Sequence, residues 1–130
     1  MKNIGFITTN KMFAQSFAET IKTRPELDYN IFLLFNPQQA IVDAEVMKTN
    51  IAIIDVVNEN SAVSEISENF LFLCEKLRKN IPECQILLLA SQYDKSNREK
   101  VINAVKNKIA DDFVLYDNSL EYLFAKLAAF

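Results

Sequence analysis

Five short apolar runs recur along the chain and alternate with segments of helical periodicity. They are rich in branched and aromatic residues, as is typical of buried strands, and they are Ile4–Ile7, Ile31–Phe35, Ile51–Ile54, Ile86–Leu89 and Phe113–Tyr116. Strands that alternate with helices form a parallel sheet, because parallel neighbours need a crossover and right-handed crossovers place helices on both faces. The sequence therefore predicts an α/β fold, a (βα)5 doubly wound five-stranded parallel sheet in a three-layer sandwich.

The segments between these runs predict five amphipathic helices. The first repeats an apolar residue every four positions, at Phe13, Phe17 and Ile21, and is expected to end at Arg24–Pro25. The second opens with Asn36–Pro37, a capping side chain followed by the residue that suits the first helical position.

The remaining three helices are predicted from their apolar stripes and their caps. The third spans 62–79, the fourth follows a cap at Asn97 or Ser96, and the fifth follows a cap at Asn118 or Ser119. Their stripes are Val63, Ile66, Phe70, Leu73 and Leu77 in the third, Val101, Ala104, Val105 and Lys108 in the fourth, and Leu120, Leu123, Phe124 and Leu127 in the fifth.

Length and charge are those expected of one domain that covers residues 1–130. Half of the 130 residues are apolar, so the chain can bury roughly two thirds of its unfolded surface. The net charge of −3 gives no general attraction for nucleic acid or an anionic membrane. No window holds the roughly eighteen apolar residues that span a bilayer, and we expect a cytoplasmic protein.

Missing residue types exclude several classes of function. Because the chain has no histidine, it cannot form a Ser-His-Asp or Cys-His catalytic site. With Gly5 as its single glycine, it cannot form a P-loop or a G-x-G-x-x-G turn. Cys74 and Cys84 indicate buried reduced thiols, not a zinc site or a disulfide framework. These absences exclude hydrolase sites of those types and mononucleotide binding through those loops. We expect a protein that is not an enzyme and has no cofactor.

Asp55 places a carboxylate directly after the buried run Ile51–Ile54, where an unpaired charge would cost several kcal/mol. In parallel α/β sheets the ligand site lies outside the carboxyl ends of the strands. We therefore expect Asp55 at the mouth of the sheet, satisfied by hydrogen bonds from Thr8, Thr9 or backbone amides.

Two stretches of the sequence carry a resemblance to a known family. "KIADDFVLYDNSLEYLFAKL" resembles the C-terminal part of the receiver domain of two-component response regulators, where Gly-Ala-Asp-Asp-aromatic-apolar-apolar-Lys-Pro-Phe-Ser precedes a leucine-rich last helix. "AIVDAEVMKTNIAIIDVV" is similar to the unit that ends in the family's phosphoacceptor aspartate, and Asp55 falls on that position. The resemblance covers the whole chain in element order and implies a flavodoxin-like, receiver-like fold.

The resemblance also implies a chemistry whose other residues have changed here. In the family, Mg²⁺ bridges the phosphoacceptor and the phosphoryl oxygens, and two acidic residues after the first strand help to hold it. Those acidic positions match Thr8 and Thr9, which are neutral. The hydroxyl position after the fourth strand matches Ala90, with Ser91 beside it as a substitute, and the lysine position after the fifth strand matches Tyr116.

We therefore interpret the chain as a degenerate receiver, or pseudo-receiver, that signals without phosphorylation and controls an attached or partner transcriptional output. The first alternative is a receiver that still accepts a phosphoryl group on Asp55, with weak Mg²⁺ binding there. The second is a flavodoxin-like binder of a small ligand such as flavin mononucleotide, through the hydroxyls and amides of "TTNK". Tyr116 either donates its hydroxyl to Asp55 or serves as an interface aromatic.

The resemblance implies protein partners. In receivers the surface of the fourth helix, fifth strand and fifth helix often mediates dimerisation, and here it involves Lys106, Phe113 and Tyr122. A twofold homodimer is expected, and a DNA-binding output domain would lie outside this chain. Phe113 falls where receivers carry an aromatic that moves on activation, but its place in a buried strand favours plain core packing. We interpret the basic residues of the fourth helical segment as a solvated face, without direct contact to nucleic acid.

Overall fold

The computed structural model describes residues 2–56, 69–115 and 120–130, and it contains five parallel strands in the order β2-β1-β3-β4-β5. Because β1 lies between β2 and β3, the strand order reverses beside β1. The strands are β1 (Lys2–Ile7), β2 (Tyr29–Leu34), β3 (Ile51–Asp55), β4 (Gln85–Ala90) and β5 (Asp112–Leu115). The predicted parallel sheet is confirmed, and the strand ends lie within two residues of those predicted.

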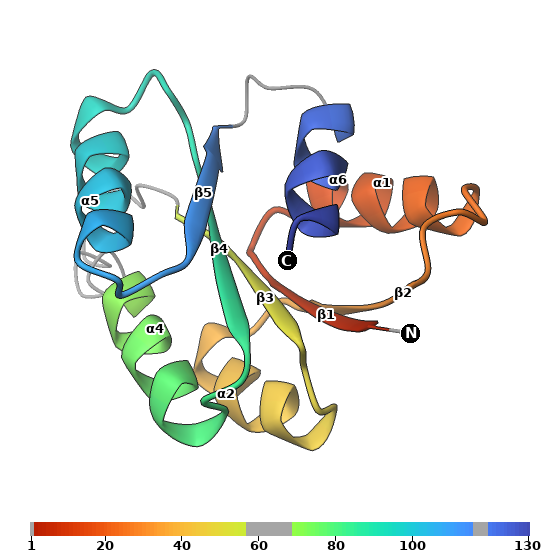
Figure 1. Ribbon diagram of the computed structural model, residues 1–130, viewed down its shortest axis with the longest axis horizontal. Helices are drawn as coiled ribbons and strands as arrows, with labels where there is room; N and C mark the ends of the chain where they lie inside the picture. The colour runs from red at the N-terminus through yellow and green to blue at the C-terminus, as the bar shows by residue number, and fades with distance from the viewer. Residues whose placement is uncertain (1, 57–68, 116–119) are drawn as a thin grey trace.

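Helices cover both faces of the sheet, so the predicted three-layer arrangement is also confirmed. Figure 1 shows α1 and α6 on one face and α2, α4 and α5 on the other. The helices are α1 (Lys11–Lys22), α2 (Pro37–Val46), α4 (Asn69–Asn80), α5 (Lys95–Lys106) and α6 (Leu120–Ala128).

In the part of the chain that the structure describes, no helix is long and apolar enough to cross a membrane.

The cap of α5 is one place where the prediction was wrong. The helix begins two or three residues earlier than expected, because Asp94 and not Asn97 or Ser96 caps it. The Asp94 side chain accepts a hydrogen bond of 3.0 Å from the backbone N–H of Asn97. Asn97 itself is buried within the helix. The predicted residues of the third helix before Asn69, and the cap predicted at 118 or 119, lie outside the described residues.

The end of α5 also differs from the prediction, since Lys108 lies beyond the helix in a left-handed conformation with φ of 61°. Lys48, just after α2, has φ of 53°. Left-handed backbone is strained for a residue with a Cβ atom, and glycine is the usual residue after a helix. The left-handed conformation of these two lysines therefore lowers the free energy of unfolding.

We expect Lys48→Gly and Lys108→Gly each to raise the free energy of unfolding by about 0.5–1 kcal/mol, measured by urea denaturation. Lys100→Gly, in the interior of α5, is the matched control and is expected to lower stability by about 1 kcal/mol. Equal destabilisation by all three variants would show that the left-handed conformation carries no strain.

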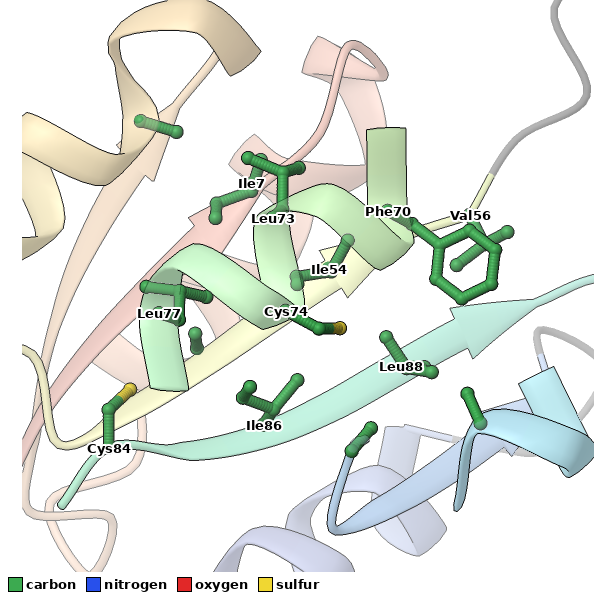
Figure 2. Close-up of a cluster of buried hydrophobic side chains, with 14 of the residues drawn as sticks. Ile7, Ile54, Val56, Phe70, Leu73, Cys74, Leu77, Cys84, Ile86 and Leu88 are labelled. Atoms are coloured by element: carbon green, nitrogen blue, oxygen red, sulfur yellow. The ribbon is translucent and has the colours of Figure 1, made fainter. Parts of the chain in front are cut away.

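Each face of the sheet has its own core. Under α1 and α6, Phe17 packs against Phe6 of β1, and Phe124 of α6 stacks on Phe17. On the opposite face, Figure 2 shows how Leu73 and Leu77 of α4 lie over the side chains of β3 and β4. Phe6, Phe17 and Leu77 are fully buried. Phe124 and Leu73 are at most 6% exposed.

Cys74 and Cys84 belong to the core under α4 (Figure 2), and both are free and buried, as the sequence predicted. Burial raises the pKa of the Cys74 thiol to about 12 and that of Cys84 to about 11. A thiol with a raised pKa is protonated at neutral pH, and a protonated thiol is a poor nucleophile.

We therefore expect neither thiol to react with Ellman's reagent at pH 8 in the folded protein, and both to react in urea. Because folding raises both pKa values, the protonated thiols stabilise the folded state fully below their unfolded pKa near 9. This stabilisation is lost as the pH rises through the folded pKa values. Rapid labelling of the native protein would contradict the raised pKa values.

Candidate functional site

The candidate site lies at the carboxyl edge of the sheet, where β1 and β3 end side by side. In their parallel register Ile7 lies opposite Ile54, so the next residues, Thr8 and Asp55, come together. The Thr8 hydroxyl donates a hydrogen bond of 2.6 Å to Oδ2 of Asp55, and the two residues are 2% and 8% exposed. The sequence predicted Thr8, Thr9 or backbone amides as partners of this carboxylate, and Thr8 is one of them.

Thr8 is itself fixed from two sides. Its backbone N–H donates to the carbonyl of Leu34 in β2 at 3.2 Å, and its Oγ1 accepts from the backbone N–H of Asn10 at 2.9 Å. The Thr8 hydroxyl therefore accepts from the β1–α1 turn and donates to Asp55. This chain of hydrogen bonds joins the start of α1 to the end of β3.

Asn10 is a functional residue that the sequence analysis missed. Besides donating to Thr8, it caps α1, because its side chain accepts a hydrogen bond of 3.1 Å from the backbone N–H of Phe13. The signal was present, since an asparagine three residues before the first apolar position of a helix is a common cap. Its cap fixes the turn that orients the Thr8 hydroxyl.

At the end of β4, Ala90 is fully buried and Ser91 opens the turn to α5. Oγ of Ser91 accepts a hydrogen bond of 3.1 Å from the backbone N–H of Tyr93, and its carbonyl accepts one of 3.3 Å from Asp94. Both oxygens of Ser91 thus stabilise their own turn. The suggestion that Ser91 replaces the family's hydroxyl stays a prediction.

Three further residues were predicted to belong to the site or its switch, which are Thr9, Tyr116 and Phe113. Thr9 is exposed beside Thr8, whereas Tyr116 lies outside the described residues, so its contact with Asp55 stays a prediction. Phe113 of β5 is partly buried in the core on the α5 side.

The predicted interface also includes Lys106 and Tyr122. Lys106 is exposed on α5, and Tyr122 of α6 is 44% exposed beneath the ammonium of Lys126. Lys126 forms an ion pair of 2.7 Å with Asp112, and this hydrogen bond is the main reason that the pKa of Lys126 is raised. The ion pair joins β5 to α6.

The Mg²⁺ site implied by the family resemblance can be tested against these contacts. Mg²⁺ binds through carboxylate oxygens and water, and here Asp55 has neutral neighbours at Thr8 and Thr9, one of which already donates to its Oδ2. Across residues 2–56, 69–115 and 120–130, no three His, Cys, Asp or Glu side chains are grouped to hold a metal ion. These residues do not fit the Mg²⁺ site of the family.

Comparison with known proteins gives the fold a context. No protein-family model and no curated protein matches the sequence. Among solved structures, a two-component response regulator from Clostridium difficile is 23% identical, with 99% of this chain and 94% of that chain covered and a TM-score of 0.75. A DNA-binding response regulator of the LuxR family from Staphylococcus aureus is 20% identical, covering 99% and 98%, with a TM-score of 0.75.

A third solved structure comes from a family described as redox sensors of the streptococci that evolved from two-component response regulators. It is 17% identical, with a TM-score of 0.74, and the alignment covers 99% of this chain and 50% of that chain. These similarities show that the chain has the flavodoxin-like α/β fold of response-regulator receiver domains.

Proposed function

We propose that this chain is an atypical receiver domain, a signalling and protein-interaction module that works without phosphorylation of Asp55. The observation that carries the proposal is the hydrogen bond of 2.6 Å from the Thr8 hydroxyl to the Asp55 carboxylate. This hydrogen bond satisfies the buried aspartate from within the chain. Thr8 stands at a position that matches one of the acidic residues that help to hold the metal ion in the receiver family.

The electrostatics of phosphoryl transfer support the proposal. Catalysis of this reaction consists almost entirely of positioning and charge stabilisation. A phosphoryl group on Asp55 would bring new negative charge to this edge of the sheet. The positions that match the family's acidic residues and lysine are held here by two threonines and a tyrosine. One retained aspartate does not supply the missing charges.

The proposed output is regulation of transcription through an attached or partner protein in the cytoplasm. The similar S. aureus protein, which is described as a DNA-binding response regulator, supports this output. We further propose a twofold homodimer through the surface of α5, β5 and α6. The exposed ring of Tyr122 supports this surface, since exposed aromatic residues are typical of interfaces. Light scattering over a concentration series that detects only monomer would contradict the dimer.

A receiver that accepts phosphate on Asp55 is the second candidate, because the carboxylate does lie at the end of β3 beside the reversal in strand order. The flavodoxin-like binder has weaker support, since the Thr8 hydroxyl of "TTNK" already serves Asp55 and Asn10.

Labelling with acetyl phosphate and Mg²⁺ distinguishes the first two candidates. We expect no phosphate on the wild-type protein, and acid-stable, base-labile incorporation into the variant Thr8→Asp/Thr9→Asp/Tyr116→Lys, which restores the acids and the lysine of the family. Adding Asp55→Asn to that variant should abolish labelling. Stoichiometric labelling of wild-type Asp55 would overturn the proposal.

A further inference from the structure

Basic residues are concentrated on one helix of an otherwise acidic chain. Residues 95–108, which comprise α5 and the turn after it, contain five basic residues and one acidic residue. The rest of the chain has nine basic and sixteen acidic residues, a balance of −7. The helix therefore carries a local field opposite in sign to that of the whole molecule.

The lysine side chains of this helix are exposed. Lys95, Lys100 and Lys106 are exposed, and among the described residues none of them forms an ion pair. Basic side chains on other elements do form such pairs, which are Arg24 with Glu121, Arg78 with Asp111 and Lys126 with Asp112. The positive charge of α5 is therefore available to a partner.

The outer face of α5 also exposes apolar surface. Residues spaced by three or four share one side of a helix, and Lys95, Glu99, Ile102 and Lys106 are all exposed, whereas Val101 and Ala104 are buried.

Ile102 is 41% exposed between the two lysines of this face, and Tyr93, in the turn before the helix, is 84% exposed. Figure 1 shows α5 at the side of the molecule away from α1 and α6. Exposed charge beside exposed apolar side chains is typical of a protein interface with a polar rim.

We infer that this outer face of α5, formed by Lys95, Glu99, Ile102 and Lys106 with Tyr93 at its start, binds an acidic segment of another protein that carries apolar residues. Charge complementarity favours this occupant. A short acidic segment can lie on this helix alone, whereas a longer nucleic acid would extend over the negative charge of the rest of the chain.

A second copy docked through the same face would oppose like charges across a twofold axis. The homodimer proposed above would therefore use the β5 and α6 side of its surface, where Asp112 and Lys126 are already paired. The inference rests on the proposed function only in that the domain acts through a protein contact, and it does not depend on the state of Asp55.

The test measures fluorescence anisotropy of a labelled synthetic peptide, an amphipathic helix of glutamates with a leucine stripe, titrated with the full chain. We expect saturable binding that weakens as salt rises. Lys95→Glu/Lys106→Glu should weaken it by at least about tenfold, and Ile102→Ala should weaken it by several fold. The control Lys22→Glu/Lys79→Glu changes the net charge equally on exposed positions of α1 and α4 and should leave binding unchanged.

Several outcomes would overturn the inference. These are no binding by the wild-type chain, equal weakening by the two double variants, or tighter binding of a single-stranded oligonucleotide through the same lysines. Self-association that Lys95→Glu/Lys106→Glu abolishes would instead assign the face to a second copy. The Asp55→Ala variant should bind the peptide normally, so a failure of the phosphorylation-independent function and a failure of this docking surface are distinguishable.

Discussion

Replacing Phe17 by alanine is expected to lower the free energy of unfolding by about 3–5 kcal/mol. Phe17 is completely buried, and its ring meets Phe6 edge to face at 5.4 Å and stacks on Phe124 at 5.6 Å. One side chain thus joins α1 to β1 and α6, and its loss leaves a cavity among three elements. Because a domain of this kind is stabilised by only about 5–15 kcal/mol, urea denaturation followed by circular dichroism should show a large fall in midpoint.

Phe72→Ala is the matched control for this prediction. Phe72 lies on α4, is 52% exposed and contacts the ammonium of Lys76 at 5.4 Å. Removing an exposed ring with one cation–π contact should cost no more than about 1 kcal/mol. Similar losses for both variants would contradict the division between the core under α1 and the exposed surface of α4.

Thr8→Val is expected to destabilise the protein by about 2 kcal/mol, the effect typical of removing a hydrogen bond to a charged group. Valine keeps the shape of threonine but has no hydroxyl, so the buried Asp55 carboxylate loses the donor at 2.6 Å, and the Asn10 N–H loses its acceptor. Thr8→Ser keeps both hydrogen bonds and should lose less. Urea denaturation at neutral pH measures the difference.

Thr49→Val supplies a control with equal burial and a neutral partner. Thr49 is 3% exposed and donates to the carbonyl of Ala44 at 2.9 Å, so its loss should cost only about 1 kcal/mol. If Thr8→Val cost no more than Thr49→Val, the hydrogen bond to Asp55 would have no special weight, and the account of the site would lose its main support.

Much of the fold was predictable because each element has a strong local signal. The runs Ile51–Ile54 and Ile86–Leu89 are too short for a buried helix, and the first is rich in β-branched isoleucine. Asn36 before Pro37 marks a helix start. The start of α5 was harder, because Asp94, Ser96 and Asn97 are all capping residues. The choice depends on which turn buries Asn97, a tertiary effect that local propensity does not contain.

The position of the site in the fold could be predicted from the sequence, but not which of the expected partners donates to Asp55. Asp55 follows a parallel strand, so its position at the carboxyl edge follows from the fold class alone. Its partner depends on the register of β1 and β3, which sets Ile7 opposite Ile54 and thereby Thr8 beside Asp55. These residues are 47 positions apart in the sequence, and their pairing is fixed by long-range packing.

The most direct test of the central claim is an amide NMR spectrum recorded before and after addition of Mg²⁺ with beryllium fluoride, a mimic of the phosphoryl group. The variant Thr8→Asp/Thr9→Asp/Tyr116→Lys serves as the positive control. We predict that the wild-type spectrum does not change, because the Thr8 hydroxyl holds Asp55 and the charges that bind the metal and the mimic are absent. Shifts that cluster at Thr8, Asp55 and Ser91 and extend to Phe113 would contradict the account and show a receiver that is still switched by phosphorylation.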